Sequence, residues 1–212
     1  MMLATMLTAC TQLPTYRYRL TVEVDTPEGL RRGSSVIQVK TQDIIGFPGP
    51  DAGGIRTSVK GEAVVVDLGR RGLLFALLRD ADSIAQLSLL PVRVDKGGTG
   101  EAAGNNLRAM KLVAGRADVP EESRPILVRF RDISDSKSVE IVDAEDLASA
   151  FGPGVRLRRI TAEITDDRMT DSIAEVLPWL GTTVTGYLSG KANWEDPGIV
   201  NSLDRGDFKK DQ

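Results

Sequence analysis

The sequence predicts an α+β fold that is mainly β, with about eight antiparallel strands and two or three short helices. Three observations support this class. Apolar and polar residues alternate with a period of two, most clearly over residues 16–25. Glycine-framed connections such as Gly69–Gly72 join neighbouring apolar runs. Segments with helical spacing are few and short, so helices are expected to fill the ends of a strand-rich body.

The first predicted element pair is a hairpin. Residues 16–25 put one set of side chains on a core face: Tyr16, Tyr18, Leu20, Val22 and Val24. The opposite face is polar: Arg17, Arg19, Thr21, Glu23 and Asp25. Residues 26–33 contain Pro27, Gly29 and Gly33, which are typical of a turn, and residues 34–41 alternate again. These patterns predict an antiparallel hairpin with one face on the core and the other in water.

The next segments predict a loop and a second pair of strands. Residues 45–54 hold two prolines and four glycines, which neither a helix nor a central strand tolerates. Residues 62–68 and 73–79 are predicted strands joined by Gly69–Gly72. The run 73–79 is apolar on both faces, so it is either a central strand or a short buried helix.

A further strand is predicted at residues 85–94, where Pro91 restricts it to an edge or a bulge. Residues 96–106 break the pattern and predict a surface loop. A short helix is expected near residues 106–115, and residues 125–131 alternate as a strand.

Two helices and one long strand are predicted further on. Residues 143–151 form a helix that Asp143 caps, with Asp146 at the capping-box position. Residues 155–165 form a strand in which Arg158 and Arg159 shift the phase, which predicts a bulge. Residues 170–180 have the apolar spacing of a helix.

The domain organisation follows from these elements. Residues 16–188 are expected to form a single strand-rich domain, and residues 189–212 a mostly irregular tail, because apolar residues become sparse there. Trp179 is expected to close the core. Trp194 in the tail is expected to fold back on the body, or otherwise to contact a partner protein or a bilayer surface.

Composition excludes several kinds of chemistry. The 212 residues contain no histidine, which removes the usual general base near neutral pH and the commonest metal ligand. A single cysteine, Cys10, excludes an internal disulfide and a thiolate zinc cage. With 27 basic and 30 acidic residues the net charge is −3, and no long basic run is present. No cofactor, metal or nucleic-acid partner is therefore expected.

The N-terminus predicts a lipid anchor. Residues 1–9 are apolar or small and uncharged, and they are too few to span a bilayer. The quartet Leu7-Thr8-Ala9-Cys10 resembles the bacterial lipoprotein box, in which a signal peptidase cuts just before an acylated cysteine. This resemblance implies a cleaved segment 1–9, lipidation of Cys10 and a tether over residues 10–15. Thr11, where Asp would favour the inner membrane, favours the outer one.

The N-terminal segment departs from a full signal peptide in two respects, because no Lys or Arg precedes it and its apolar stretch is short. A start codon assigned too far downstream explains both. The alternative is a hydrophobic N-terminal arm in which Cys10 is an incidental thiol.

Most of the body resembles a family of short proteobacterial proteins, often beginning with a lipoprotein box, that has no established activity. The resemblance covers four runs: YRYRLTVEVDTPEGL, GEAVVVDLGRRGLLFALLR, SRPILVRFRDISDSKSVEIVDAEDLASAFGPGVRLRRITAEIT and IAEVLPWL. It implies export and transfers no catalytic residue.

Three kinds of motif are candidates for chemistry. Gly97, Gly98, Gly100 and Gly104 miss the Walker and dinucleotide spacings, so a plain loop is favoured over phosphate binding. Ser134 to Lys137 has the Ser-x-x-Lys spacing of penicillin-recognising enzymes, but it lies between strands and lacks their partner motifs. Carboxylates cluster in three places, where caps and turns explain them more simply than a glycosidase pair: Asp132 and Asp135; Asp143, Glu145 and Asp146; Asp166, Asp167 and Asp171.

Together these patterns predict a membrane-anchored envelope lipoprotein that faces the periplasm, with a non-enzymatic binding or structural body. Its expected partners are the membrane, through Cys10, and another envelope protein. No catalytic, cofactor-binding or metal residue is predicted. Two alternatives stay open: a periplasmic hydrolase that uses carboxylates alone, and a soluble protein that is not exported.

Overall fold

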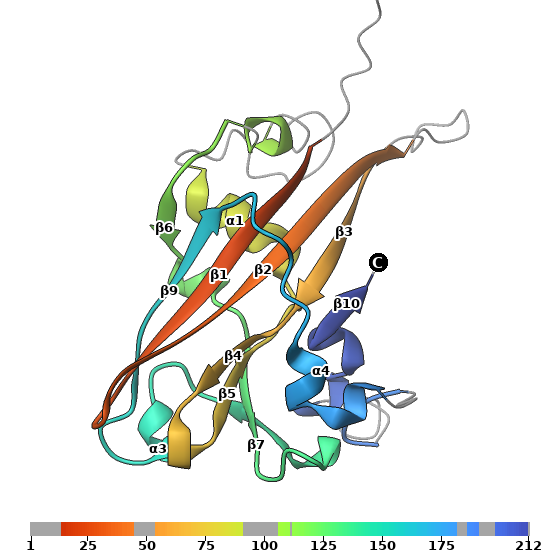
Figure 1. Ribbon diagram of the computed structural model, residues 1–212. Helices are drawn as coiled ribbons and strands as arrows, with labels where there is room; N and C mark the ends of the chain where they lie inside the picture. Colours follow the sequence, from red (N-terminus) through yellow and green to blue (C-terminus); the bar gives the residue numbers. More distant parts are fainter. Residues whose placement is uncertain are drawn as a thin grey trace, which may run out of the picture.

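The computed structural model describes residues 14–44, 54–90, 106–110, 112–181, 186–190 and 198–211. Within these ranges the strands form two antiparallel sheets, one of six strands and one of four. The mainly β fold class predicted from the sequence is confirmed, with more strands than the eight expected. The connections between the strands hold short α-helices and 3-10 helices (Figure 1).

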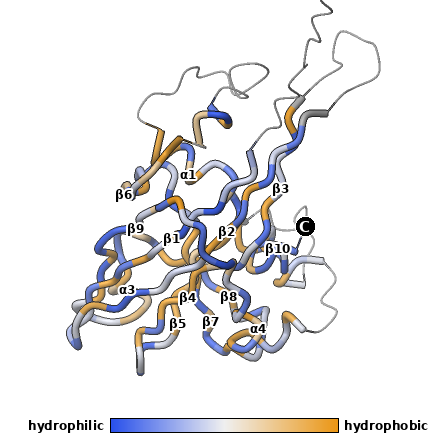
Figure 2. Tube along the Cα trace, turned by 45° about the horizontal axis from the view of Figure 1, so that its top comes forward, coloured by the Kyte–Doolittle hydropathy of each residue, from blue (hydrophilic) through white to orange (hydrophobic). Residues whose placement is uncertain are grey.

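The larger sheet has the strand order β10-β3-β2-β1-β9-β6. Its strands are β1 (Thr15–Thr26), β2 (Gly29–Ile44), β3 (Gly54–Glu62), β6 (Arg116–Asp118), β9 (Arg156–Ile164) and β10 (Lys209–Asp211). The predicted first hairpin is confirmed, because β1 and β2 pair in register from Thr15 opposite Lys40 to Thr26 opposite Gly29. Hydrophobic and hydrophilic residues alternate along the long strands (Figure 2), so the sheet has an inner face on the core and a polar outer face.

The smaller sheet has the order β4-β5-β7-β8 and is covered on both sides. Its strands are β4 (Val64–Asp67), β5 (Leu73–Ala76), β7 (Leu127–Phe130) and β8 (Val139–Val142). In β5, Leu74 packs in one hydrophobic cluster and Phe75 in another. The run 73–79 therefore contains a central strand, which decides between the two alternatives, and a 3-10 helix η1 (Gly69–Arg71) joins it to β4.

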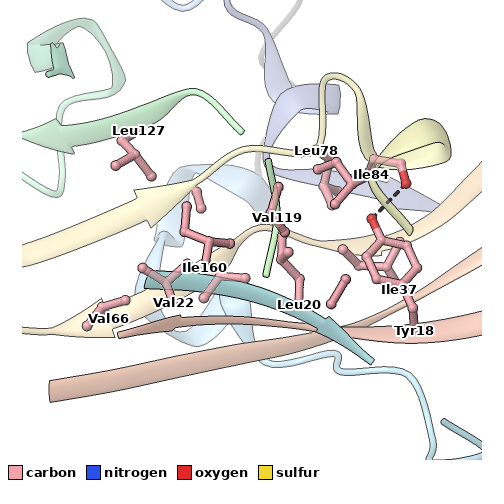
Figure 3. Close-up of a cluster of buried hydrophobic side chains, with 14 of the residues drawn as sticks. Tyr18, Leu20, Val22, Ile37, Val66, Leu78, Ile84, Val119, Leu127 and Ile160 are labelled. Carbon is pink, nitrogen blue, oxygen red and sulfur yellow. Dashed lines mark hydrogen bonds between the residues drawn. The ribbon is translucent and has the colours of Figure 1, made fainter. Parts of the chain in front are cut away.

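The two sheets meet where β4 crosses β2 at Gly33. A Cβ atom on Gly33 would lie 2.0 Å from the carbonyl oxygen of Val65, so only glycine permits this approach. Helix α1 (Ala81–Leu89) packs on the inner face of the larger sheet. The fully buried Tyr18 points toward it and donates a hydrogen bond of 2.6 Å to the carbonyl oxygen of Ala81 (Figure 3).

Helix α1 corrects the prediction of a strand at residues 85–94. Ala81, Ile84 and Ala85 are buried at helical spacing, and the helix begins upstream of the predicted strand, just after Asp80. Pro91, the glycine motif from Gly97 to Gly104 and most of the predicted loop at 96–106 lie outside the described residues. Residues 106–109 are helical, as expected for part of 106–115.

The predicted helix at 143–151 is shorter than expected. Helix α3 (Leu147–Phe151) is capped by Asp146, whose carboxylate accepts from the Ser149 amide at 3.2 Å. The prediction that Asp143 caps the helix is wrong; it accepts instead from the Glu145 amide at 2.9 Å, in a turn before the helix. Local Asp-to-amide bonds of this kind compete with a helical start.

The predicted bulge in the long strand is confirmed. Glu23 pairs with Arg159 and Val24 with Leu157, so Arg158 is the extra residue of β9.

The predicted helix at 170–180 is divided into α4 (Ile173–Val176) and the 3-10 helix η4 (Pro178–Gly181), because Pro178 supplies no amide donor. The other 3-10 helices are η2 (Glu121–Ser123), η3 (Ser136–Ser138), η5 (Ile199–Ser202) and η6 (Arg205–Asp207).

The C-terminal part differs from the irregular tail predicted at 189–212. Residues 198–211 form η5, η6 and β10, and Phe208 is fully buried. The guanidinium of Arg79 binds both carboxylate oxygens of Asp207, at 3.1 and 3.0 Å. Trp179 closes the same cluster, as predicted, with its ring centroid 5.5 Å from that of Phe208. The buried ring of Phe208 and the Arg79–Asp207 ion pair thus hold residues 198–211 against the body, although this segment is mostly polar.

Candidate anion-binding face

The outer face of the larger sheet is crossed by residues 165–172, which we call the strap. After β9 the strap passes over β1 and β2 toward α4, on the side of the sheet opposite α1 (Figure 1). The Thr165 amide donates to the Arg17 carbonyl at 3.1 Å. The Thr170 hydroxyl accepts from the Val36 amide at 2.9 Å. The strap is therefore fixed to β1 and β2 by backbone groups.

A buried carboxylate holds the end of the strap. Glu62, at the end of β3, is 2% exposed and accepts three hydrogen bonds from the last strap residue and the residue after it. The donors are the Ser172 amide at 2.7 Å, the Ser172 hydroxyl at 3.1 Å and the Ile173 amide at 2.9 Å. These bonds satisfy a carboxylate that would otherwise be costly to bury.

A cleft of about 370 Å³ lies between the strap, β3 and β10, and we call it the strap cleft. Its lining residues are Arg17, Lys60, Gly61, Arg168, Met169, Thr170, Asp171, Lys209, Lys210 and Asp211. Five of them are cationic and two are carboxylates. A chain with a net charge of −3 thus gathers an excess of positive charge in one cleft.

Some of these charges are held in place by neighbours. Lys209 donates to the Asp171 carboxylate at 2.6 Å. This hydrogen bond raises the pKa of Lys209 and lowers that of Asp171, so both stay charged at neutral pH. Arg17 donates to the Asp167 carbonyl at 2.8 Å, and Lys210 to the Leu78 carbonyl at 3.2 Å. Because these two partners are neutral carbonyl groups, the bonds do not offset the charge of Arg17 or of Lys210.

A second cleft of about 330 Å³ lies on the other side of the strap. It is lined by three arginines, two carboxylates and three hydroxyl residues: Arg19, Arg32, Arg116, Glu163, Asp167, Thr21, Ser34 and Thr165. Thr21 of β1 faces Ser34 of β2 in register, which places two hydroxyls side by side. Asp167 forms an ion pair with Arg19, and Glu163 one of 3.1 Å with Arg116. Most of the charge here is paired within the cleft.

Ammonium and guanidinium groups can bind carboxylate or phosphate oxygens by charge-assisted hydrogen bonds. The strap cleft offers five such groups within a volume suited to a small molecule. In the described part of the chain, no three His, Cys, Asp or Glu residues converge as metal ligands would. The arrangement is thus suited to holding an anion.

The structure separates most of the sequence-derived candidates. Cys10 and Trp194 lie outside the described residues, as do the glycines of the 97–104 motif. Ser134 lies in the β7–β8 connection, where its amide donates to Asp132 at 2.9 Å, and the Lys137 amide donates to Asp135 at 3.0 Å. These are turn contacts, and the Ser-x-x-Lys residues do not form the helix that the enzyme interpretation requires.

The carboxylate groups also act locally. Asp143 and Asp146 form the turn and cap before α3, and Glu145 pairs with Arg124. In the third group, Asp167 and Asp171 lie on the strap and serve as counter-charges for Arg19 and Lys209. Only this group belongs to the outer-face clefts.

Sequence reasoning missed the cations of the strap cleft. The alternation of the first strand places Arg17 on its polar face, but Lys60, Arg168, Lys209 and Lys210 come from three other segments. No local pattern joins them. The pair Lys209-Lys210 is the nearest to a sequence signal, and it falls in the predicted tail.

Comparison with known protein families, curated proteins and solved structures finds no match to this chain. Among the helices in the described ranges, none combines the length and the apolarity needed to cross a bilayer. The fold and the charged clefts are therefore the basis for a functional assignment.

Proposed function

We propose that this chain is a lipid-anchored protein of the bacterial cell envelope, whose body is a non-enzymatic module that binds a small anionic ligand in the strap cleft. The anchor is proposed from Leu7-Thr8-Ala9-Cys10 and from the resemblance of the body to proteobacterial lipoproteins. Acyl chains on Cys10 would hold the protein at the periplasmic side of a membrane, with the outer membrane favoured. Several buried chains give stable anchoring where one does not.

The binding role is supported by one main observation, the gathering of five cationic side chains in a single cleft of an acidic chain. Four of them come from strands of the larger sheet, and Glu62 holds the strap that carries Arg168. Preorganised charges of this kind lower the entropic cost of binding. The ligand class that fits is a small molecule with a phosphate or carboxylate group.

The anchor is tested by labelling cells with radioactive palmitate. The wild-type chain should carry the label and fractionate with membranes, whereas Cys10→Ala should lose both properties. Soluble behaviour of the wild-type chain without added lipid mass would contradict the anchor and favour a protein that is not exported.

The cleft is tested by titrating the full-length Cys10→Ala chain with inorganic phosphate and with succinate, using calorimetry. Lys60→Gln/Arg168→Gln should weaken binding at least about tenfold, because hydrogen bonds to charged groups each contribute about 1.5–3 kcal/mol. A matched control, Arg131→Gln/Lys137→Gln, removes one Arg and one Lys from the β7–β8 connection. Equal loss in both double variants, or binding of neither probe, would contradict this assignment.

A further inference from the structure

The end of the larger sheet that carries the β1–β2 turn is built from arginine pairs on shared carboxylates. Glu23 binds Arg32 and, at 2.7 Å, Arg159. Asp25 binds Arg156 at 3.2 Å and Arg158 at 3.3 Å. Glu28 binds Arg70 and Arg71, both at 3.1 Å. We call these nine residues the arginine end.

The arginine end carries more positive than negative charge. Six guanidinium groups share three carboxylates. Arg31 lies beside Gly69, and Asp67 accepts from the Gly69 amide at 2.7 Å, so these two neighbours add one charge of each sign. Asp118 lies near enough to Arg159 to act on its pKa and adds one more negative charge, so an excess of two positive charges remains at one end of a chain whose net charge is −3.

Two of the three carboxylates, Glu23 and Asp25, lie beneath their arginines, whereas Glu28 lies between the exposed Arg70 and the more buried Arg71. The Glu23 side chain is 2% exposed and that of Asp25 is 26% exposed, whereas the side chains of Arg156 and Arg70 are 79% and 82% exposed. A guanidinium has five N–H donors in a fixed planar fork. Binding to a carboxylate below orients the fork, and the remaining donors of Arg156 and Arg70 point to the surface.

The ion pairs persist at neutral pH. Hydrogen bonding by Arg71 lowers the pKa of Glu28 to about 2, and hydrogen bonding by Arg159 lowers the pKa of Glu23. Both carboxylates therefore stay ionised well below neutral pH and keep their arginines oriented. An anion that arrives at this end meets groups that are already in position.

An apolar side chain stands at the turn itself. Thr26 and Gly29 pair in register across the two-residue turn, and the Thr26 hydroxyl donates to the Gly29 carbonyl at 2.8 Å. The next residue, Leu30, is 46% exposed. The hairpin projects this turn at one end of the molecule (Figure 1). Leu30 lies opposite Asp25 in the register, and Asp25 binds Arg156 and Arg158. An exposed leucine next to this charged cluster suits the boundary between lipid headgroups and acyl chains.

We propose that the arginine end docks on a membrane surface rich in anionic phospholipid headgroups. Arginine binds phosphate oxygens in bidentate fashion, and basic residues near an anionic leaflet add attraction one by one. A protein partner is less well matched, because interface centres are rich in aromatic residues as well as arginine, and none of the nine residues of the arginine end is aromatic.

This contact is independent of the proposed lipid anchor. Strand β1 begins at Thr15, at the end of the proposed tether, and its 12 residues rise about 36 Å before the turn. The arginine end therefore lies at the far end of the hairpin from the tether. Docking here is a second contact with a membrane surface, and it does not need an acylated Cys10.

The test uses the full-length Cys10→Ala chain, which cannot carry the proposed lipid. Flotation with vesicles of phosphatidylglycerol and phosphatidylethanolamine is compared with flotation on phosphatidylcholine vesicles, at low and high salt. We expect binding to the anionic vesicles alone, weakening as salt rises. Arg156→Gln/Arg158→Gln should reduce affinity about fivefold for each arginine removed, or roughly 25-fold together.

Three variants separate docking from other effects. Arg156→Lys/Arg158→Lys keeps the charge but lacks the guanidinium fork, and it should lose part of the binding, less than Arg156→Gln/Arg158→Gln loses. Arg131→Gln/Lys137→Gln removes two basic residues elsewhere and should bind as the parent chain does. Lys60→Gln/Arg168→Gln, which alters the strap cleft, should also bind normally, so failure of the cleft assignment leaves this inference intact.

Absence of any preference for anionic vesicles would overturn the inference. It is also overturned if the strap-cleft or the β7–β8 double variant loses as much binding as Arg156→Gln/Arg158→Gln. Melting temperatures of all variants are measured alongside, and a loss of binding is counted only for variants that remain folded.

Discussion

Replacing Glu62 by alanine should loosen the strap without unfolding the sheets. Glu62 binds both Ser172 and Ile173, the first residue of α4, through three hydrogen bonds of 2.7 to 3.1 Å. In Glu62→Ala the Ile173 amide is left buried without this acceptor, whereas the groups of the exposed Ser172 can bind water. The Ile173 amide is therefore the principal source of the loss.

The magnitude follows from these contacts. A hydrogen bond to a charged group contributes about 1.5–3 kcal/mol, and a buried amide without a partner costs about 1–3 kcal/mol. Because water replaces the two Ser172 bonds, we expect a total loss of about 2–4 kcal/mol in the free energy of unfolding. For a domain of this size the melting temperature should fall by roughly 4 to 16 °C.

The assay combines urea unfolding with amide hydrogen exchange. Glu62→Ala should lower the urea midpoint and accelerate exchange most at Ser172 and Ile173, with β1 and β2 protected as in the wild type. The control is Glu175→Ala, which removes an exposed carboxylate from α4 itself. If Glu62→Ala is as stable as Glu175→Ala, or if exchange rises equally throughout the sheet, Glu62 does not hold the strap as described.

Three further changes test the sheet junction, the arginine end and the C-terminal segment. Gly33→Ala should lower the free energy of unfolding by about 1–3 kcal/mol or more, because the added Cβ forces β2 away from β4. Gly181→Ala is the control: its Cβ would meet nothing within 4 Å, so the same urea titration should show little change. Arg159 and Arg32 lower the pKa of Glu23, so the ionised Glu23 stabilises the fold at pH values above its ordinary pKa, and this stabilisation is lost as the pH falls through the lowered pKa. The difference in unfolding free energy between the wild type and Glu23→Gln should therefore be large at pH 7 and small in acid. A difference that does not change with pH would contradict this. Arg79→Ala should lower the free energy of unfolding by about 2–4 kcal/mol and expose residues 198–211 to proteolysis, because Asp207 loses a bidentate partner. An unchanged cleavage pattern would show that Arg79 does not hold this segment.

Features that depend on neighbouring residues could be predicted from the sequence. The alternation over residues 16–25 assigns Tyr18 and Leu20 to the core face of β1, and both are buried. The double arginine at 158 and 159 predicts the bulge that the register contains. These predictions succeed because the period of a strand is visible within a few residues.

Features that depend on contacts between residues distant in the sequence could not be predicted. Helix α1 was missed because the stretch 85–90 fits both a strand and a helix, and the deciding contacts, such as Tyr18 with Ala81, are long-range. The clefts were missed for the same reason, since Arg17 and Arg168 line one cleft from positions far apart in the chain. A sequence without long basic runs can still gather charge on one face when strands pair antiparallel.

The pairing of β1 with β9 has a consequence for the time that folding takes. Leu20 lies opposite Ala162, so a central strand of the larger sheet stays without one neighbour until most of the chain is available. Chains dominated by such remote pairings fold in milliseconds to seconds, slower than helical domains. A polypeptide that reaches its native state slowly is a good substrate for transport across a membrane in extended form, which the proposed route to the envelope requires.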